Sequence, residues 1–169
     1  QRPESSGWVK VNSKNPFDEL LSILKAEKGL DISPDFFMGT TINHPLFSVL
    51  RWYFKSKNAV CLNTGVKLRE NLGSKYSLEL DHIFPYSVMR DNGYDQKNRY
   101  NYSLVQEVTN RAILTQIENR IKGAEYPATY LKSVQENHPN AIALQCIPEE
   151  PNLWEIDNFE SFLEIRRNL

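Results

Sequence analysis

The sequence predicts an α+β fold that is mostly helical and contains a two-stranded hairpin followed by a helix. Apolar residues recur at helical spacing in several segments, and apolar and polar residues alternate, as in a strand, near the middle of the chain. A chain of 169 residues is large enough for one sizeable core and too short for two ordinary domains. Its hydrophobic content of 40%, with 8 Tyr, 8 Phe and 3 Trp, indicates a packed globular protein.

The first part of the chain carries three helical signals. Asn15-Pro16 supplies a cap and a favourable first helical residue, and we expect this helix to end at Gly29. A short element is expected to begin at Ser33-Pro34. Another helix is expected after His44-Pro45, because an apolar stripe follows: Leu46, Val49, Leu50, Tyr53 and Phe54.

Residues 76–83 form the predicted first strand. Leu78 and Leu80 fall on one face, whereas Glu79 and Asp81 fall on the other, because successive strand residues point to opposite sides. We expect a turn-rich loop that contains Asp91-Asn92-Gly93 and residues 98–102, and a second extended segment over residues 104–114.

Helices are expected in the last third of the chain. They lie near residues 115–121, after Pro127 and over residues 158–167. One side of the last helix carries Phe159, Phe162, Leu163 and Arg166.

Asp81 and His82 pair a hard metal ligand with a general base at the end of the predicted strand. The Asp81 carboxylate suits Mg²⁺, which prefers oxygen ligands and keeps several waters. His82 is the side chain best suited to take a proton near neutral pH. Asn119 could supply a second, neutral oxygen to the same ion. Such a set predicts metal-assisted hydrolysis of a phosphodiester.

These residues resemble the motif of HNH nucleases, which form a ββα-metal hairpin and helix. The first half of the resemblance is Asp81-His82-Ile83-x-Pro85. The second half is Asn110-x-x-x-Leu114-Thr115-x-x-x-Asn119-Arg120-x-Lys122, whose step of nine from Asn110 to Asn119 is shared by CRISPR-effector HNH domains. Between the halves the chain inserts a longer excursion, residues 86–102, than compact HNH hairpins carry.

A narrower resemblance covers the chain from about His44 to its end. It is similar to the C-terminal nuclease domain of GmrSD-type restriction proteins, defence enzymes that act on modified phage DNA. The matching residues include Ile83-Phe84-Pro85, Pro127-x-x-Tyr130-Leu131, Gln145-x-Ile147-Pro148, Trp154 and Phe162-x-x-x-Arg166. The resemblance implies a nuclease domain over residues 44–169 and a helical extension over residues 1–43. It also implies an N-terminal nucleotidase domain with a ParB-like fold in a longer protein.

Each candidate residue has an expected role. His82 would be the general base. The HNH resemblance implies that Asn110 holds, by hydrogen bonds to backbone groups, the loop that aims this histidine. Asp81 and Asn119 would bind Mg²⁺ or Mn²⁺, with Glu79 as an accessory ligand.

Three basic residues form a candidate phosphate-binding patch: Arg111, Arg120 and Lys122. For Arg120 and Lys122 a solvated basic helix face is the competing interpretation. For Glu79 the competing interpretation is an ordinary polar strand position.

Charge and cysteine content limit the possible partners and location. The net charge of −1 predicts weak DNA binding by these residues alone. Cys61 and Cys146 stand far apart without a CxxC pair, so we expect no structural zinc and two scattered thiols rather than a disulfide. No run reaches transmembrane length, and a cytoplasmic location is expected.

The predicted function is therefore a magnesium-dependent DNA endonuclease that nicks foreign DNA in anti-phage defence. The family resemblance implies 5′-phosphate and 3′-hydroxyl products. Two alternatives stay open: an HNH nuclease of a mobile element or CRISPR-associated system, and a non-catalytic module that engages DNA.

Overall fold

The computed structural model describes Ser22, residues 32–69 and residues 77–169. One compact unit runs from Pro34 to Leu169, and all the elements below belong to it. The predicted helix from Asn15 to Gly29 lies outside the described residues. No helix of the described part is both long and apolar enough to cross a membrane.

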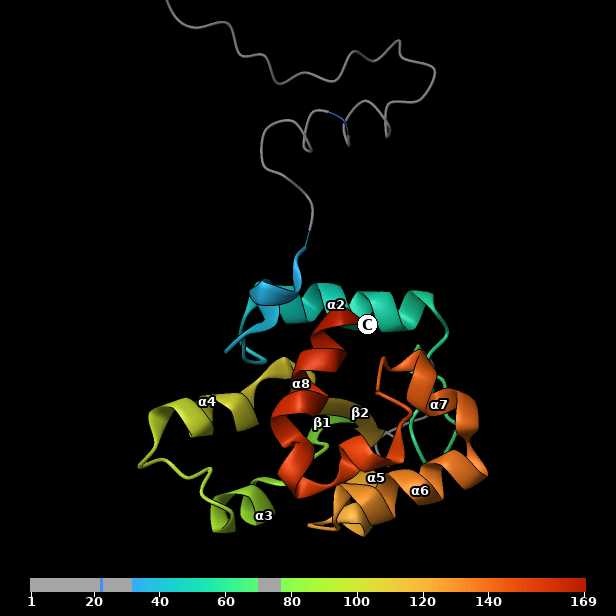
Figure 1. Ribbon diagram of the computed structural model, residues 1–169. Helices are drawn as coiled ribbons and strands as arrows, with labels where there is room; N and C mark the ends of the chain where they lie inside the picture. The colour runs from blue at the N-terminus through green and yellow to red at the C-terminus, as the bar shows by residue number, and fades with distance from the viewer. Residues whose placement is uncertain (1–21, 23–31, 70–76) are drawn as a thin grey trace, which may run out of the picture. The chain divides into compact units, whose positions relative to one another are not determined.

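The unit is α+β and mostly helical, as the sequence predicts. Its elements, in chain order, are η1 (Pro34–Phe37), α2 (Pro45–Ser56), β1 (Leu78–His82), α3 (Tyr86–Asp91), α4 (Arg99–Gln106), η3 (Val108–Asn110), β2 (Arg111–Thr115), α5 (Gln116–Lys122), α6 (Pro127–Asn137), α7 (Pro139–Leu144), η4 (Pro151–Trp154), η5 (Ile156–Asn158) and α8 (Phe159–Asn168). Figure 1 shows β1 and β2 in the middle of the unit, with α2 above them and α5 and α6 below.

The two strands pair antiparallel over their whole length. Leu78 lies opposite Thr115, Leu80 opposite Ile113 and His82 opposite Arg111. Because directly opposed residues share a face, one face of the hairpin carries these side chains and the other carries Glu79 and Asp81 with their partners Leu114 and Ala112.

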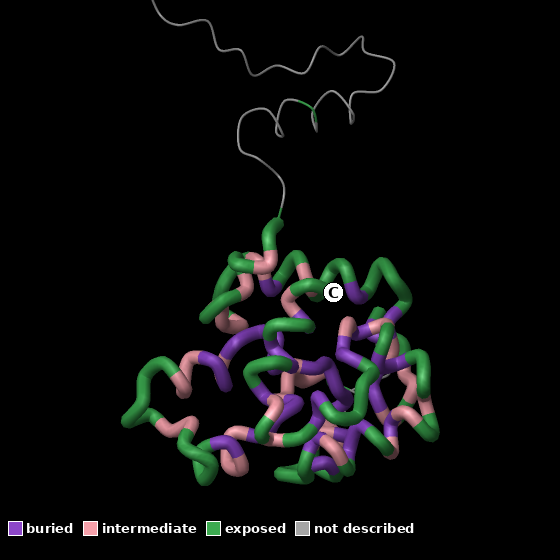
Figure 2. The backbone as a smooth tube through the Cα atoms, viewed as in Figure 1, coloured by how far each residue is buried: buried purple, intermediate pink, exposed green. Residues whose placement is uncertain are grey.

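The two faces meet different parts of the core. Ile113, with Leu78 and Leu80 beside it, joins a smaller cluster that includes Phe54 of α2. Ala112 and Leu114 join the larger cluster with Leu131 and Val134 of α6. In Figure 2 buried segments run through the centre of the unit, where β2 is buried from Ala112 to Thr115 and β1 is half-buried. The predicted separation of Leu78 and Leu80 from Glu79 and Asp81 is therefore confirmed.

Gly39 and Thr40, which precede the predicted domain start at His44, also form hydrogen bonds within this unit. The backbone N–H of Gly39 donates to Oε2 of Glu107 at 3.0 Å, and the N–H of Val108 donates to the carbonyl of Thr40 at 2.8 Å. Glu107 is completely buried and pairs with Arg167 of α8 at 2.7 Å. The compact unit thus begins at Pro34, before the predicted domain start at His44.

The prediction of a turn-rich loop over residues 91–93 and 98–102 is only partly correct. Residues 92–98 are irregular, but α3 extends to Asp91 and α4 begins at Arg99. Asn98 caps α4 by accepting a hydrogen bond from the N–H of Asn101 at 3.2 Å. An edge contact between the rings of Tyr86 and Tyr102, with centroids 5.6 Å apart, joins the two helices. In α4, helix formation and this contact outweigh the turn preference of Asn101, whereas Asn92 and Gly93 form the turn that follows α3.

The prediction of an extended segment over residues 104–114 is only partly correct. The strand begins at Arg111, because α4 continues to Gln106 and a 3-10 turn occupies Val108–Asn110. Leu104 and Val105 are buried on α4, so their apolar character reflects a helix face rather than a strand. The helix α7, which follows α6 closely, was not predicted.

A buried carboxylate joins the hairpin to the loop after α2. Thr115 and Glu118 form a reciprocal capping box at the start of α5, in which Oε2 of Glu118 accepts from the N–H of Thr115 at 2.7 Å. Oε1 of Glu118 accepts from the N–H groups of Asn63 and Thr64. Burial, followed by the nearby Glu118 charge, raises the pKa of the Cys61 thiol to about 12.

Replacing Glu118 by Ala should destabilise the unit strongly. Three backbone N–H groups would lose their acceptor inside the protein, which predicts a loss of about 3 kcal/mol in the free energy of unfolding. Urea denaturation would measure the loss, with Glu125→Ala as the control because Glu125 is exposed just beyond the same helix. Equal stability of the two variants would contradict the assignment of Glu118 as a structural acceptor.

Candidate active site

Helix α5 lies against the acidic face of β1 and supplies one partner to each carboxylate. Nδ2 of Asn119 donates to Oε2 of Glu79 at 2.9 Å. Nζ of Lys122 lies 2.6 Å from Oδ2 of Asp81. This pairing follows from the two periodicities, because residues two apart on a strand and three apart on a helix each share a face. The structure therefore brings Glu79, Asp81, Asn119 and Lys122 together.

Asn110 has the bracing contacts that the sequence predicts for it. Its side chain is fully buried, and Oδ1 accepts from the N–H of Phe84 at 2.9 Å. Nδ2 donates to the carbonyls of Phe84 at 3.2 Å and Val105 at 3.0 Å. The carbonyl of Asn110 also accepts from the N–H of Ile83 at 2.9 Å. The segment directly after His82 is thus fixed by one asparagine.

The His82 side chain lies on the other face of the hairpin from Asp81. Its Nδ1 is 3.3 Å from Nη1 of Arg111. Nη2 of the same guanidinium donates to Oε1 of Gln106 at 2.8 Å. Its Nε2 is buried and has no partner among the described residues. Burial first, and then the Arg111 charge, lowers the pKa of His82 to about 4, so the imidazole is neutral at pH 7.

A guanidinium group can only donate hydrogen bonds, so Arg111 must be the donor in its contact with His82. The hydrogen bond to Arg111 therefore requires a lone pair on Nδ1 of His82 and leaves the proton on Nε2. Burial lowers the pKa of Arg111 itself. Nδ1 is the basic nitrogen of this histidine.

The three predicted phosphate contacts are placed very differently. The Lys122 side chain is only 1% exposed and is fully engaged inside the unit, so its predicted role as a phosphate contact needs correction. Arg111 is half-buried against His82 and Gln106. Arg120 is exposed on the outer side of α5, since Asn119 and Lys122 occupy the inner side.

Sequence reasoning missed several residues that shape the site. Glu118 had a readable signal, because Thr115-x-x-Glu118 has the capping-box pattern. Gln145 belongs to the residues of the GmrSD-type resemblance, but no role was predicted for it: its side-chain amide satisfies both the N–H and the carbonyl of Ile113 on the outer edge of β2, at 2.9 Å each. Gln106 carries no sequence signal, because only the fold brings it to Arg111.

The donor set on the acidic face fits a hard divalent cation. Two carboxylates and one carboxamide are oxygen donors of the kind that Mg²⁺ and Mn²⁺ accept. Among the described residues no three His, Cys, Asp or Glu side chains form a metal-binding group. A cation here would therefore depend on the amide of Asn119 and on water as well as on Glu79 and Asp81.

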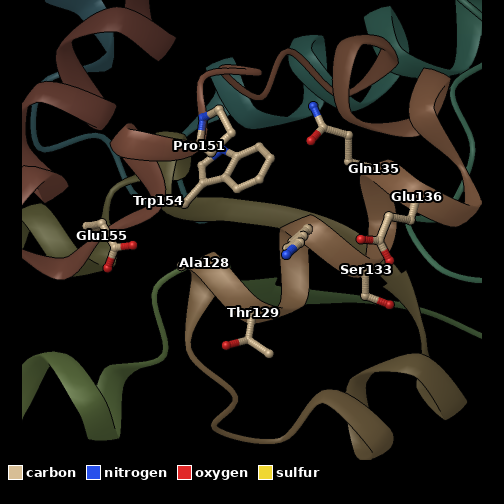
Figure 3. A pocket seen from close by; sticks show the side chains of 9 residues that line it. Ala128, Thr129, Ser133, Gln135, Glu136, Pro151, Trp154 and Glu155 are labelled. Carbon is tan, nitrogen blue, oxygen red and sulfur yellow. The ribbon is translucent and has the colours of Figure 1, made fainter.

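A separate cleft of about 690 Å³ lies between α6 and η4. Figure 3 shows its lining residues, which include Thr129, Ser133 and Glu136 of α6 and Pro151 and Trp154 of η4. Trp154 is almost fully buried, and its Nε1 donates to the carbonyl of Pro148 at 2.8 Å, so its role in this wall is packing. None of the candidate catalytic or metal-binding residues lines the cleft.

No protein-family model, curated protein or solved structure matches this chain. The resemblance to HNH nucleases stays a prediction that rests on the residues and geometry of this chain.

The lowered pKa of His82 predicts an acid-sensitive contribution to stability. In the folded state the imidazole protonates near pH 4 rather than 6.5, so the unfolded state binds more protons between these values. This stabilisation is present above pH 6.5 and is lost as the pH falls towards 4, at roughly 1 kcal/mol per pH unit.

Denaturant unfolding in EDTA at several pH values would measure this slope. The variant His82→Gln, which does not titrate there, should show a slope smaller by about that amount. An identical slope for both proteins would show that His82 is not held in its neutral form.

Proposed function

We propose that residues 34–169 form an HNH-type, metal-dependent DNA endonuclease domain that nicks one strand. The observation that carries the proposal is the strand–strand–helix arrangement in which α5 sets Asn119 and Lys122 over Glu79 and Asp81. Supporting it, Asn110 braces the segment that follows His82. An acidic strand face, an amide from the next helix and an adjacent neutral histidine are the groups that phosphodiester hydrolysis needs.

Asp81, Glu79 and Asn119 are the residues that would hold the Mg²⁺ or Mn²⁺ ion. When bound, such an ion supplies Lewis-acid stabilisation of charge on the phosphate and the leaving oxygen. Asp81 reaches solvent, with 20% of its side chain exposed, so the face is accessible. Asn119 donates through Nδ2 to Glu79, which leaves its Oδ1 as the ligand atom.

His82 would take the proton of the attacking water through Nδ1. Burial and the Arg111 charge keep the imidazole neutral, which is the form that accepts a proton, but the same lowered pKa makes it a weaker base than a histidine that titrates near neutral pH. Its present partner at Nδ1 is Arg111, so the water would have to replace that hydrogen bond. A guanidinium beside the same nitrogen would then also be close to the phosphate that the water attacks.

The substrate is proposed to be foreign DNA, in a restriction or anti-phage setting. The net charge of −1 supports a division of labour in which DNA affinity comes largely from an N-terminal ParB-like nucleotidase domain of a longer protein. A mobile-element or CRISPR-associated HNH nuclease would use the same site in another setting.

A non-catalytic DNA-engaging module is the second candidate function. The observation that favours it is the position of His82, whose ring shares the hairpin face with Arg111 and whose Nε2 is buried, while Asp81 lies on the opposite face. Catalysis would require both side chains to reach one phosphate at the end of β1.

A plasmid-nicking assay with and without Mg²⁺ distinguishes the two candidates. His82→Ala should lower the nicking rate by ~10² to 10⁴, because it removes the general base. Asp81→Ala should abolish nicking or greatly raise the Mg²⁺ requirement, and Asn119→Ala should do so more mildly, because an amide contributes only a dipole. Asp91→Ala, at an exposed aspartate on α3, is the matched control and should nick normally. Absence of nicking by the unaltered protein with Mg²⁺ or Mn²⁺ would favour the non-catalytic module.

DNA binding should depend on the exposed Arg120 more than on the half-buried Arg111 or the buried Lys122. Removing one phosphate contact reduces the slope of log affinity against log salt concentration by about 0.9. Fluorescence anisotropy at two or more salt concentrations should show this for Arg120→Ala. The control Arg51→Ala removes the same charge from α2, the helix that lies on the other side of the hairpin from α5 in Figure 1. This variant should leave the slope unchanged. A change of equal size in both variants would point to net charge alone.

A further inference from the structure

Lys122 is the most deeply buried cation on the acidic side of the hairpin. Its side chain is 1% exposed, and its Nζ lies 2.6 Å from Oδ2 of Asp81 and 2.8 Å from the carbonyl of His82. The same Nζ sits 5.5 Å from the centre of the Tyr130 ring. A buried ammonium is costly unless it is paired and hydrogen-bonded, and all three partners meet that need.

These contacts hold Lys122 in place from several directions. Tyr130 belongs to α6 and is itself 2% exposed, so its ring shields the ammonium from water. The backbone carbonyl of His82 is part of the hairpin and cannot follow a departing side chain. Moving the ammonium into water would leave the Asp81 carboxylate and this carbonyl without their partner. The lysine therefore stays beside Asp81 when another cation arrives.

We propose that Lys122 is a positioning residue that acts as a built-in counter-ion for Asp81: it fixes the carboxylate through Oδ2, leaves Oδ1 for a divalent cation, and weakens the binding of that cation. The inference rests on the proposed metal site. It reassigns Lys122 from contacting phosphate to controlling the metal ligand.

The charges on this face give the expected direction. Glu79 and Asp81 contribute two negative charges, and Lys122 cancels one of them at contact distance. Removing the ammonium would leave both carboxylates uncompensated, so a divalent cation would be attracted more strongly. A residue with a merely structural role would act oppositely, because its loss would disorder Asp81 and weaken metal binding.

The test is calorimetric titration of Mn²⁺ into the protein at fixed ionic strength. Lys122→Met keeps the length of the side chain and removes the charge, and should bind Mn²⁺ at least about tenfold more tightly than the unaltered protein. Lys55→Met on α2 changes the net charge equally at an exposed position and should leave the affinity unchanged. Equal or weaker Mn²⁺ binding by Lys122→Met would overturn the proposal.

Two further variants keep the test decisive. Lys122→Gln retains a hydrogen-bond donor for the His82 carbonyl and should also bind Mn²⁺ more tightly, which covers the case in which Lys122→Met does not fold in EDTA. Asp81→Asn combined with Lys122→Gln should lose the gain, because the new affinity belongs to Asp81. A gain that persists in this double variant would overturn the proposal.

The outcome is separable from that of the proposed function. Tighter Mn²⁺ binding by the Lys122 variants without any nicking by the unaltered protein would support the counter-ion and reject the nuclease. Normal nicking with unchanged Mn²⁺ affinity in those variants would support the nuclease and reject the counter-ion.

Discussion

A two-stranded sheet inside a helical unit has two open edges, and the structure depends on how side chains complete the hydrogen bonding there. Two strands alone are marginally stable, and each buried backbone group without a partner is costly. Gln145 supplies a donor and an acceptor to Ile113 on the outer edge of β2, and Asn110 does the same for Phe84 beyond the end of β1. Gln145 takes the place of a third strand beside β2, whereas Asn110 continues the pairing between the two strands beyond His82 and Arg111.

Buried charges follow the same rule of local compensation. Glu118 accepts from three backbone N–H groups, whereas the buried Arg166 guanidinium donates to the carbonyls of Thr109, Arg111, Gln145 and Cys146. Burial lowers the pKa of Arg166 to about 10. These ions connect loops and helix ends to the hairpin, because a backbone dipole can satisfy a charge without a second ion. The candidate site is therefore supported by polar contacts on several sides.

The site itself divides across the hairpin. The metal-ligand candidates face α5, and the histidine faces Arg111 and Gln106, so each half has its own electrostatic control. On one half a lysine compensates Asp81, and on the other an arginine and burial keep His82 neutral. The proposed chemistry requires both halves to meet a phosphate at the end of β1, where the ladder stops and Asn110 fixes the chain. This requirement links the bracing of residues 83–84 to any activity at His82.

The sequence was enough to predict the mostly helical α+β class, the strand around residues 78–82, and the shared face of Glu79 and Asp81. These features follow from local periodicity, which the chain carries whatever it packs against. It also predicted the helix after β2 and the bracing position of Asn110. The start of α4 at Arg99 could not be read from the sequence, because Asn98 and Asn101 also suit a turn and tertiary contacts select the helix. The tertiary structure alone decided that Lys122 is buried against Asp81, that Asn119 bonds to Glu79, and that Gln145 and Gln106 reach the hairpin. Those contacts join residues far apart in the chain, and spacing along a sequence does not specify which distant partner a long polar side chain will meet.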